Sequence, residues 1–170
     1  MKTAHATIEK SKPSIAEEQF LTFKLCGQEY GISAIKVQEI KGWEKVTPIP
    51  NSPPYIRGVL NLRGLIVPVI DLRLRFNLEE IGYTPVTAIV VVNISERLAG
   101  LVVDSVSDVI EVSDDQRCAA PDFEGHKDRE FISGLAQIDG KLLILLDIDR
   151  MVNPETLDKT ETAAPVAAAM

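Results

Sequence analysis

An internal repeat limits the possible fold more than any other feature of this sequence. When Tyr55–Phe76 is laid without gaps over Phe131–Val152, 76 positions later, four residues are identical and nearly every other apolar position stays apolar. Upstream, Phe20–Ile40 aligns in the same way with Ile89–Val109, 69 positions later. The seven-residue difference between the two offsets fits in the polar stretch Ser113–Glu130 of the second copy. The chain is therefore predicted to fold as two similar units of about 70 residues.

Each unit is predicted to consist mainly of short β-strands. The apolar residues form β-branched runs separated by Gly, Pro, Asn and Asp, and Asp139-Gly140 is typical of a tight hairpin turn. Asp71 and Asp147 each follow a strand and precede the short helical patterns Leu72–Phe76 and Ile148–Val152, so we expect them to cap helices. The other hairpin signals are Cys26-Gly27-Gln28 and Leu62-Arg63-Gly64, and the predicted strands include Gln19–Cys26, Leu65–Ile70, Thr87–Ile94, Leu98–Val103 and Lys141–Leu146.

The repeat divides the chain into a β core and two ends that differ from it in composition. Residues 19–157 hold the core, with a first barrel at roughly 19–85, a second at roughly 86–152, and possible exchange of strands between them. Residues 1–18 and 158–170 lack apolar periodicity and are expected to be flexible. A unit of about 70 residues buries only about 60% of the surface that its unfolded chain exposes, so the two units should share a hydrophobic interface. Five or so twisted strands in each would close into a small barrel.

Composition disfavours several classes of function. Twenty-five acidic against eighteen basic residues give a net charge of −7, the wrong sign for binding nucleic acid or an anionic membrane. No apolar run is long enough to cross a bilayer and the N-terminus lacks the pattern of a signal peptide, so a cytoplasmic location is expected. The two cysteines lack metal-ligand spacing and there is no phosphate-binding glycine motif, so we expect no metal and no cofactor.

The acidic residues leave one enzymatic alternative open. A small hydrolase would use Asp104, Asp108 or the pair Asp114 and Asp115 as acid and base, but these residues lie in polar, solvated sequence. His126 is the only histidine placed where it could take part in catalysis. An SH3-like nucleic-acid-binding module is a second alternative, which the acidic balance disfavours. We expect no enzymatic activity.

A few charged residues stand beside apolar ones in places suited to binding. Glu39 and Arg63 are either solvated surface charges or the polar rim of a docking groove between the two units. Val37, Val106 and Val109 would form the apolar part of that groove, or else belong to the core.

A proline-rich segment lies between Glu39 and Arg63 in the sequence. Thr47–Tyr55 holds four prolines, so it cannot be a central strand and should form a rigid, shaped edge. Trp43, the only tryptophan, either anchors a partner or packs in the core.

Three segments carry a resemblance to a known family. They are YIRGVLNLRGLIVPVIDLRLRF, YGISAIKVQEI upstream of it and VVDSVSDVIEV downstream of it. Together they resemble the CheW family of bacterial chemotaxis coupling proteins, and the likeness extends from about Glu18 to Asn153. The resemblance implies a mostly β fold of two intertwined five-stranded SH3-like barrels with short helices, in agreement with the repeat. It also implies a non-catalytic adaptor that couples methyl-accepting chemoreceptors to the histidine kinase CheA.

The resemblance assigns functions to individual residues. In such proteins the receptor tip docks in the groove between the subdomains, and the kinase pairs with the outer edge of the first barrel. Pro48 and Pro50 follow the kinase-contacting strand and depart from some relatives, so the resemblance defines this edge less well than the groove. Carried over by position, the receptor-binding residues are Val37, Glu39, Gly58, Arg63, Val106 and Val109, and the kinase-binding residues are Val46 and Thr47.

The implied partners are the regulatory domain of CheA and the cytoplasmic tips of methyl-accepting chemotaxis receptors. The chain is expected to be monomeric when free and to be recruited to membrane-associated receptor arrays without inserting into the membrane. A variant within the family is a CheW-like coupling module of a larger adaptor or of another receptor–kinase pathway. The stand-alone coupler is preferred because the sequence contains no receiver domain.

Overall fold

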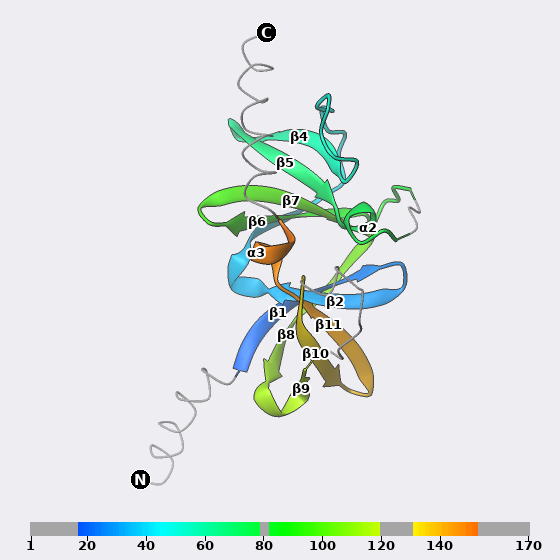
Figure 1. Ribbon diagram of the computed structural model, residues 1–170, viewed down its shortest axis with the longest axis vertical. Coiled ribbons are helices and arrows are strands. Elements are labelled where there is room, and N and C mark those ends of the chain that lie inside the picture. Colours follow the sequence, from blue (N-terminus) through cyan, green and yellow to red (C-terminus); the bar gives the residue numbers. More distant parts are fainter. Residues whose placement is uncertain (1–16, 79–81, 120–130, 153–170) are drawn as a thin grey trace.

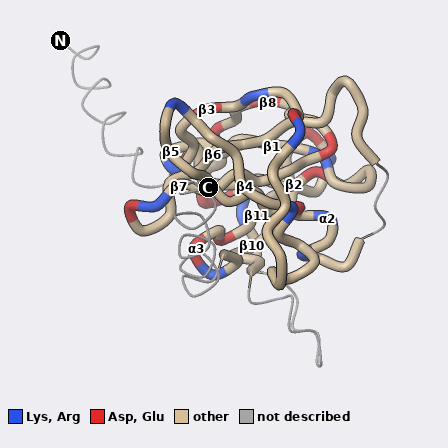
Figure 2. The backbone as a smooth tube through the Cα atoms, turned by 90° about the horizontal axis from the view of Figure 1, so that it is seen from above, with Lys and Arg blue, Asp and Glu red and all other residues tan. Residues whose placement is uncertain are grey.

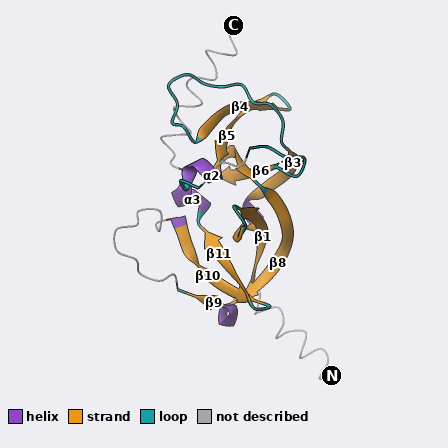
Figure 3. Cartoon of the chain, turned by 90° about the vertical axis from the view of Figure 1, so that its right-hand side faces the viewer, coloured by secondary structure: helices purple, strands orange, loops and turns teal. Residues whose placement is uncertain are grey.

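The computed structural model describes residues 17–78, 82–119 and 131–152, which form two β-sheets with short helices at their junction (Figures 1 and 3). The mostly β fold class predicted from the sequence is confirmed. Residues 1–16 of the expected leader and all of the expected tail, 158–170, lie outside the described residues.

Sheet A contains six strands in the order β8-β1-β2-β11-β10-β9. β2 and β11 are parallel neighbours, and the other pairs are antiparallel. The part of the long polar insertion that the structure describes forms a 3-10 helix, η3 (Asp114–Gln116), and the sixth strand β9. The strands are β1 (Glu17–Leu25), β2 (Gln28–Ser33), β8 (Ser105–Ser113), β9 (Arg117–Cys118), β10 (Ile132–Ile138) and β11 (Lys141–Leu146).

Sheet B contains five strands in the order β3-β6-β7-β5-β4. Its parallel pair is β5 and β7, and the other neighbours are antiparallel. A 3-10 helix, η2 (Ala34–Lys36), carries the chain from β2 in sheet A to β3 in sheet B. The strands are β3 (Val37–Gly42), β4 (Ile56–Leu62), β5 (Leu65–Asp71), β6 (Ala88–Ile94) and β7 (Arg97–Val103).

The two sheets repeat one plan but exchange strands between the two copies of the sequence. Through the repeat, β8-β1-β2-β11-β10 of sheet A corresponds in the same order to β3-β6-β7-β5-β4 of sheet B. Each sheet takes a hairpin from one copy and three strands from the other, because the chain crosses to the opposite sheet after β2 and again after β7. The ranges 19–85 and 86–152 therefore do not coincide with the two sheets, because strands are exchanged across that boundary.

One hydrophobic core joins the sheets. Its buried side chains include Phe23 and Ile32 from sheet A and Val90 and Leu101 from sheet B. Two smaller clusters lie within the individual sheets, one around Leu60, Val69 and Val91 of sheet B and one around Phe20, Val112 and Leu145 of sheet A. A row of aromatic rings crosses the junction with neighbouring centroids 5.9–6.2 Å apart, from Phe23 through Tyr30 and Phe76 to Phe131.

A short helix follows each of the two equivalent hairpins, β4–β5 and β10–β11, as the sequence predicted. The carboxylate of Asp71 accepts a hydrogen bond from the Arg73 amide at the start of α2 (Leu72–Arg75). Asp147 accepts from the amides of Asp149 and Arg150 at the start of α3 (Ile148–Met151). Both aspartates are therefore N-caps, which satisfy amides that have no partner inside the helix. Figures 1 and 3 place both helices between the sheets.

The exchange of strands leads to a prediction about unfolding. We expect both sheets to unfold in a single transition, because the largest core cluster draws on both and neither sheet can be assembled from one half of the chain. Differential scanning calorimetry should give equal calorimetric and van't Hoff enthalpies. Two resolved transitions would contradict the shared core.

Candidate functional site

Glu39 and Arg63 form an ion pair at one end of sheet B. Glu39 lies on the edge strand β3, and Arg63 lies in the turn between β4 and β5. Nη2 of Arg63 donates to Oε1 of Glu39 over 2.6 Å. The Arg63 side chain is 75% exposed, so most of it is open to a partner. The structure thus brings together the two charged residues that the sequence singled out.

The local backbone explains why Arg63 points outward. Arg63 and Gly64 have positive φ angles of 50° and 90°, which is typical of the two central residues of a type I′ hairpin turn. The amide of Gly64 donates to Oδ1 of Asn61 over 2.8 Å and holds the turn. A side chain at the tip of such a turn does not reach the core, so Arg63 lies at the surface.

The three valines proposed for the groove differ in burial. Val37 and Val106 are partly buried and pack against the core that joins the sheets. Val109 is 50% exposed on β8, and its counterpart in the repeat, Ile40 on β3, is 45% exposed. Because β3 and β8 are edge strands, Val109 and Ile40 are apolar side chains at open sheet edges. The valines therefore divide between core and surface.

Val46 and Thr47 lie beside β4, the other edge strand of sheet B. The amide of Thr47 donates to the Val59 carbonyl over 2.9 Å, and the amide of Val59 donates to the Thr47 carbonyl over 2.8 Å. Val46 is partly buried against the cluster around Leu60. Gly58 faces the same segment, since a Cβ built there would lie 2.2 Å from the Thr47 carbonyl oxygen. Gly58 thus contacts the predicted kinase-binding segment, away from the tip that carries Arg63.

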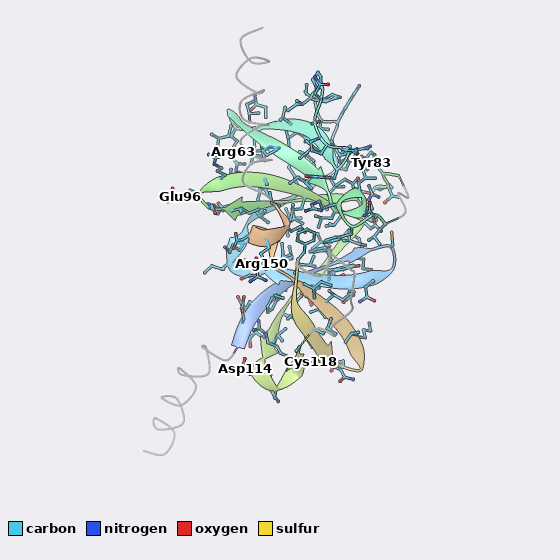
Figure 4. All side chains as sticks on the ribbon, viewed as in Figure 1. Arg63, Tyr83, Glu96, Asp114, Cys118 and Arg150 are labelled. Atoms are coloured by element: carbon cyan, nitrogen blue, oxygen red, sulfur yellow. The ribbon has the colours of Figure 1, made fainter. Side chains whose placement is uncertain are left out.

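An aromatic hollow of about 370 Å³ adjoins Val46. Trp43 and Tyr83 stack with ring centroids 3.8 Å apart, and the Arg57 guanidinium lies 5.3 Å from the Tyr83 centroid. Trp43 is half-buried, so it is both packed against the protein and present at the surface. Figure 4 shows Arg63 and Tyr83 at opposite ends of sheet B, which separates this hollow from the ion pair. Sequence reasoning missed Tyr83 because nothing in its loop is periodic.

A buried charged network, which the sequence did not indicate, lies next to Tyr83. The Arg73 side chain is 1% exposed and donates through Nε and Nη2 to the two carboxylate oxygens of Asp71, each at 3.0 Å. Its Nη1 donates to the Gly82 carbonyl at 2.8 Å and to Asp104 at 3.2 Å. The hydrogen bonds to Asp71 raise the pKa of Arg73 above its ordinary value, so the guanidinium stays charged although it is buried.

Three of the aspartates considered for hydrolysis have structural positions in the fold. Asp104 also accepts a hydrogen bond from the Cys26 amide at 2.8 Å, and Asp114 and Asp115 form the first turn of η3. His126 lies outside the described residues. Within residues 17–78, 82–119 and 131–152, no three or more His, Cys, Asp or Glu side chains gather where they could hold a metal ion. In the same ranges, no helix is long and apolar enough to span a membrane.

Known proteins are similar to this chain in sequence and in fold. A family model described as the CheW-like domain matches residues 19–155. The chain belongs to the CheW family. It is 40% identical over 159 residues to the chemotaxis protein CheW of Klebsiella aerogenes, a match that covers 94% of this chain and 96% of the relative. CheW of Bacillus subtilis is 34% identical over 148 residues, which cover 87% of this chain and 93% of the relative.

A solved CheW structure has the same fold. The scaffolding protein TtCheW from Thermoanaerobacter tengcongensis is 33% identical and superposes with a TM-score of 0.74, covering 80% of this chain and 94% of that protein. The recognition of the CheW family from sequence is therefore confirmed. Membership makes the chain a chemotaxis adaptor of the CheW type.

Proposed function

We propose that this chain couples the cytoplasmic tips of methyl-accepting chemoreceptors to the regulatory domain of the histidine kinase CheA. It does so by binding alone, with no catalysis and no cofactor. The observation that carries the proposal is the exposed Glu39–Arg63 pair at one end of sheet B, separate from the Thr47 edge. Two distinct surfaces on one rigid fold suit a protein that holds two partners at once.

The receptor surface consists of charged and apolar residues that suit a helical tip. Arg63 and Glu39 supply orienting charges, and Val109 supplies exposed apolar area. An amphipathic helical hairpin needs this combination, because apolar contact gives affinity and charges fix the orientation. Val37 and Val106 support the surface from the core. Gly58, which the resemblance assigns to the receptor, lies on the strand that leads to Arg63 but packs against Thr47, so we place it at the kinase edge.

The kinase surface is the edge formed by Val46 and Thr47. Thr47 pairs with β4 only at Val59, so the segment leaves backbone groups at the edge of the sheet available for pairing with another chain. The aromatic hollow next to Val46 adds apolar area and two prolines, Pro48 and Pro54. Figure 2 shows Lys and Arg interspersed with Asp and Glu around the fold, which favours specific docking at such surfaces over binding through one large charged face.

The cellular setting follows from these partners. The chain acts in the cytoplasm as a free monomer and joins membrane-associated receptor arrays through its two contacts, without inserting into the bilayer. Each contact can be weak, because simultaneous binding to several neighbours in an array multiplies the overall affinity.

Separate titrations of a soluble receptor fragment and the CheA regulatory domain test this proposal. Arg63→Ala and Glu39→Ala are each expected to weaken receptor binding by about 1–3 kcal/mol, the range for a lost charge-assisted hydrogen bond. Kinase binding should change by less than about 0.5 kcal/mol. Val46→Asp should do the reverse, because it places a charge without a partner at the kinase edge.

Two controls keep the result interpretable. Arg150→Ala removes another exposed arginine, whose side chain is 69% exposed, and should leave both affinities unchanged. Thermal unfolding of each variant shows whether the fold is intact, and Arg63→Ala should cost under about 1 kcal/mol because its ion pair is exposed. Loss of kinase affinity with retained receptor affinity in Arg63→Ala would refute the assignment of the two surfaces.

A further inference from the structure

The end of sheet A at the β10–β11 turn is the counterpart, through the repeat, of the end of sheet B that carries Arg63. Asp139 lies 76 positions after Arg63, and Asp108 lies 69 positions after Glu39, which are the two offsets of the repeat. The backbones agree: φ is 51° at Asp139 and 50° at Arg63, and the strand pairings have a bulge at corresponding places. Equivalent positions thus hold an opposite-charge pair in one sheet and two carboxylates in the other.

The two carboxylates at this end of sheet A cannot neutralise each other. Asp108 Oδ1 accepts a hydrogen bond from the Val109 amide at 2.7 Å, and in the described part of the chain neither Asp108 nor Asp139 has an ion-pair partner. In sheet B the exposed Arg63 guanidinium is already bound to Glu39. At the position that Arg63 occupies in sheet B, the corresponding corner of sheet A therefore has a carboxylate and no cation.

Between these carboxylates lies a hollow of about 200 Å³ with an apolar floor. Leu142 is 50% exposed there, and Ile110 and Ile138 are partly buried against the small core of sheet A. The charged groups at the rim are three carboxylates and one ammonium, from Glu29, Asp108, Asp139 and Lys141. A partly apolar hollow with an excess of negative charge complements an apolar side chain that is flanked by cations.

We propose that this hollow, lined by Asp108, Ile110, Ile138, Asp139 and Leu142, is a third docking surface, which takes an apolar side chain flanked by arginine or lysine from a partner protein. Successive residues of a strand point to opposite faces, so Asp108 and Ile110 lie on the face of β8 opposite to Val109. A partner held here would not compete for the receptor surface. The inference goes beyond the coupling function, which uses two surfaces.

An NMR titration of the ¹⁵N-labelled full chain tests the proposal with a defined probe. The probe is the capped peptide Gly-Ser-Arg-Leu-Arg-Gly-Ser, and the matched control peptides carry glutamate in place of both arginines or alanine in place of leucine. Saturable shifts are expected with a Kd of about 1 mM, centred on the amides of Asp108–Ile110 and Ile138–Leu143. Both control peptides should bind at least fivefold more weakly, and so should the probe in about 0.5 M salt, which screens exposed charges.

A second test changes the protein instead of the peptide. Asp108→Glu/Asp139→Arg recreates in sheet A the residues of the Glu39–Arg63 corner, so an internal cation should occupy the site and the peptide shifts should be lost. Asp139→Asn, which tolerates the same positive φ, removes one charge and should weaken binding severalfold even if the double variant folds poorly.

Each remaining outcome counts against the proposal. Equal binding of the glutamate peptide, shifts centred elsewhere, or the absence of shifts at several millimolar probe would overturn it. Shifts of the same amides that depend on protein concentration without peptide would assign the hollow to a second copy of this chain, and would also overturn it.

Discussion

Arg73→Ala is expected to destabilise the fold by about 3–5 kcal/mol, the cost of removing one partner from a buried ion pair. The Asp71 side chain is completely buried, and both of its carboxylate oxygens accept hydrogen bonds from the Arg73 guanidinium. Alanine would leave this carboxylate in the interior without a cation. Urea unfolding at neutral pH should show a much lower midpoint with a similar slope, because a similar amount of surface is exposed on unfolding.

A double variant separates loss of the charge pair from loss of packing. Asp71→Asn/Arg73→Met removes both charges and keeps side chains of similar size, and the asparagine can still cap α2. It should be more stable than Arg73→Ala, because the fully buried carboxylate of Asp71 is gone, while Asp104 is 21% exposed and keeps the hydrogen bond from the Cys26 amide. If Arg73→Ala cost less than about 1 kcal/mol, or if the double variant were the less stable of the two, the buried pair would not be the source of the effect.

The position of Arg73 gives the network a role in aligning the sheets. Asp104 binds Arg73 of sheet B's helix and the amide of Cys26 in the β1–β2 turn of sheet A. The guanidinium carbon of Arg73 also lies 5.4 Å from the ring centroid of Tyr83, and Tyr83 lines the aromatic hollow beside the proposed kinase edge. The network therefore ties the junction of the sheets to that edge.

Local features of the fold could be predicted from the sequence because they depend on local chemistry. Asp71 and Asp147 precede short helices and cap them, and Asp139-Gly140 forms the tight turn that its residues favour. The repeat predicted two equivalent units, and equivalent strand orders are found. It could not show which copy supplies which strand, since two similar copies offer nearly the same pairing surfaces.

The candidate site was predicted less completely. Glu39 and Arg63 stood out as charges beside apolar residues, and they pair at 2.6 Å. The burial of Arg73 could not be read from LRLRF, because the same pattern fits an exposed amphipathic turn. Besides Asp71, the buried guanidinium contacts Asp104, which is 31 residues away in the chain. Contacts of this kind follow from tertiary structure alone.

Gly58→Ala is expected to detach the Thr47 segment from β4. A Cβ at Gly58 would lie 2.2 Å from the Thr47 carbonyl oxygen and 2.6 Å from its carbonyl carbon, and φ is +148°. These are backbone atoms, so they cannot move aside as a flexible side chain does. The two hydrogen bonds between Thr47 and Val59 should break, which together with backbone strain costs about 2–4 kcal/mol. If Thr47 contacts the kinase, affinity for the CheA regulatory domain should fall at least tenfold.

Gly27→Ala is the matched control for this effect. Gly27 also has positive φ, +83°, but no atom lies within 4 Å of the position that its Cβ would take. Its replacement should therefore cost only backbone strain, about 1 kcal/mol, and leave kinase binding unchanged. Hydrogen exchange should accelerate at the Thr47 and Val59 amides in Gly58→Ala and not in Gly27→Ala. Equal stability loss and equal exchange in the two variants would show that close approach to Thr47 is not what requires glycine at position 58.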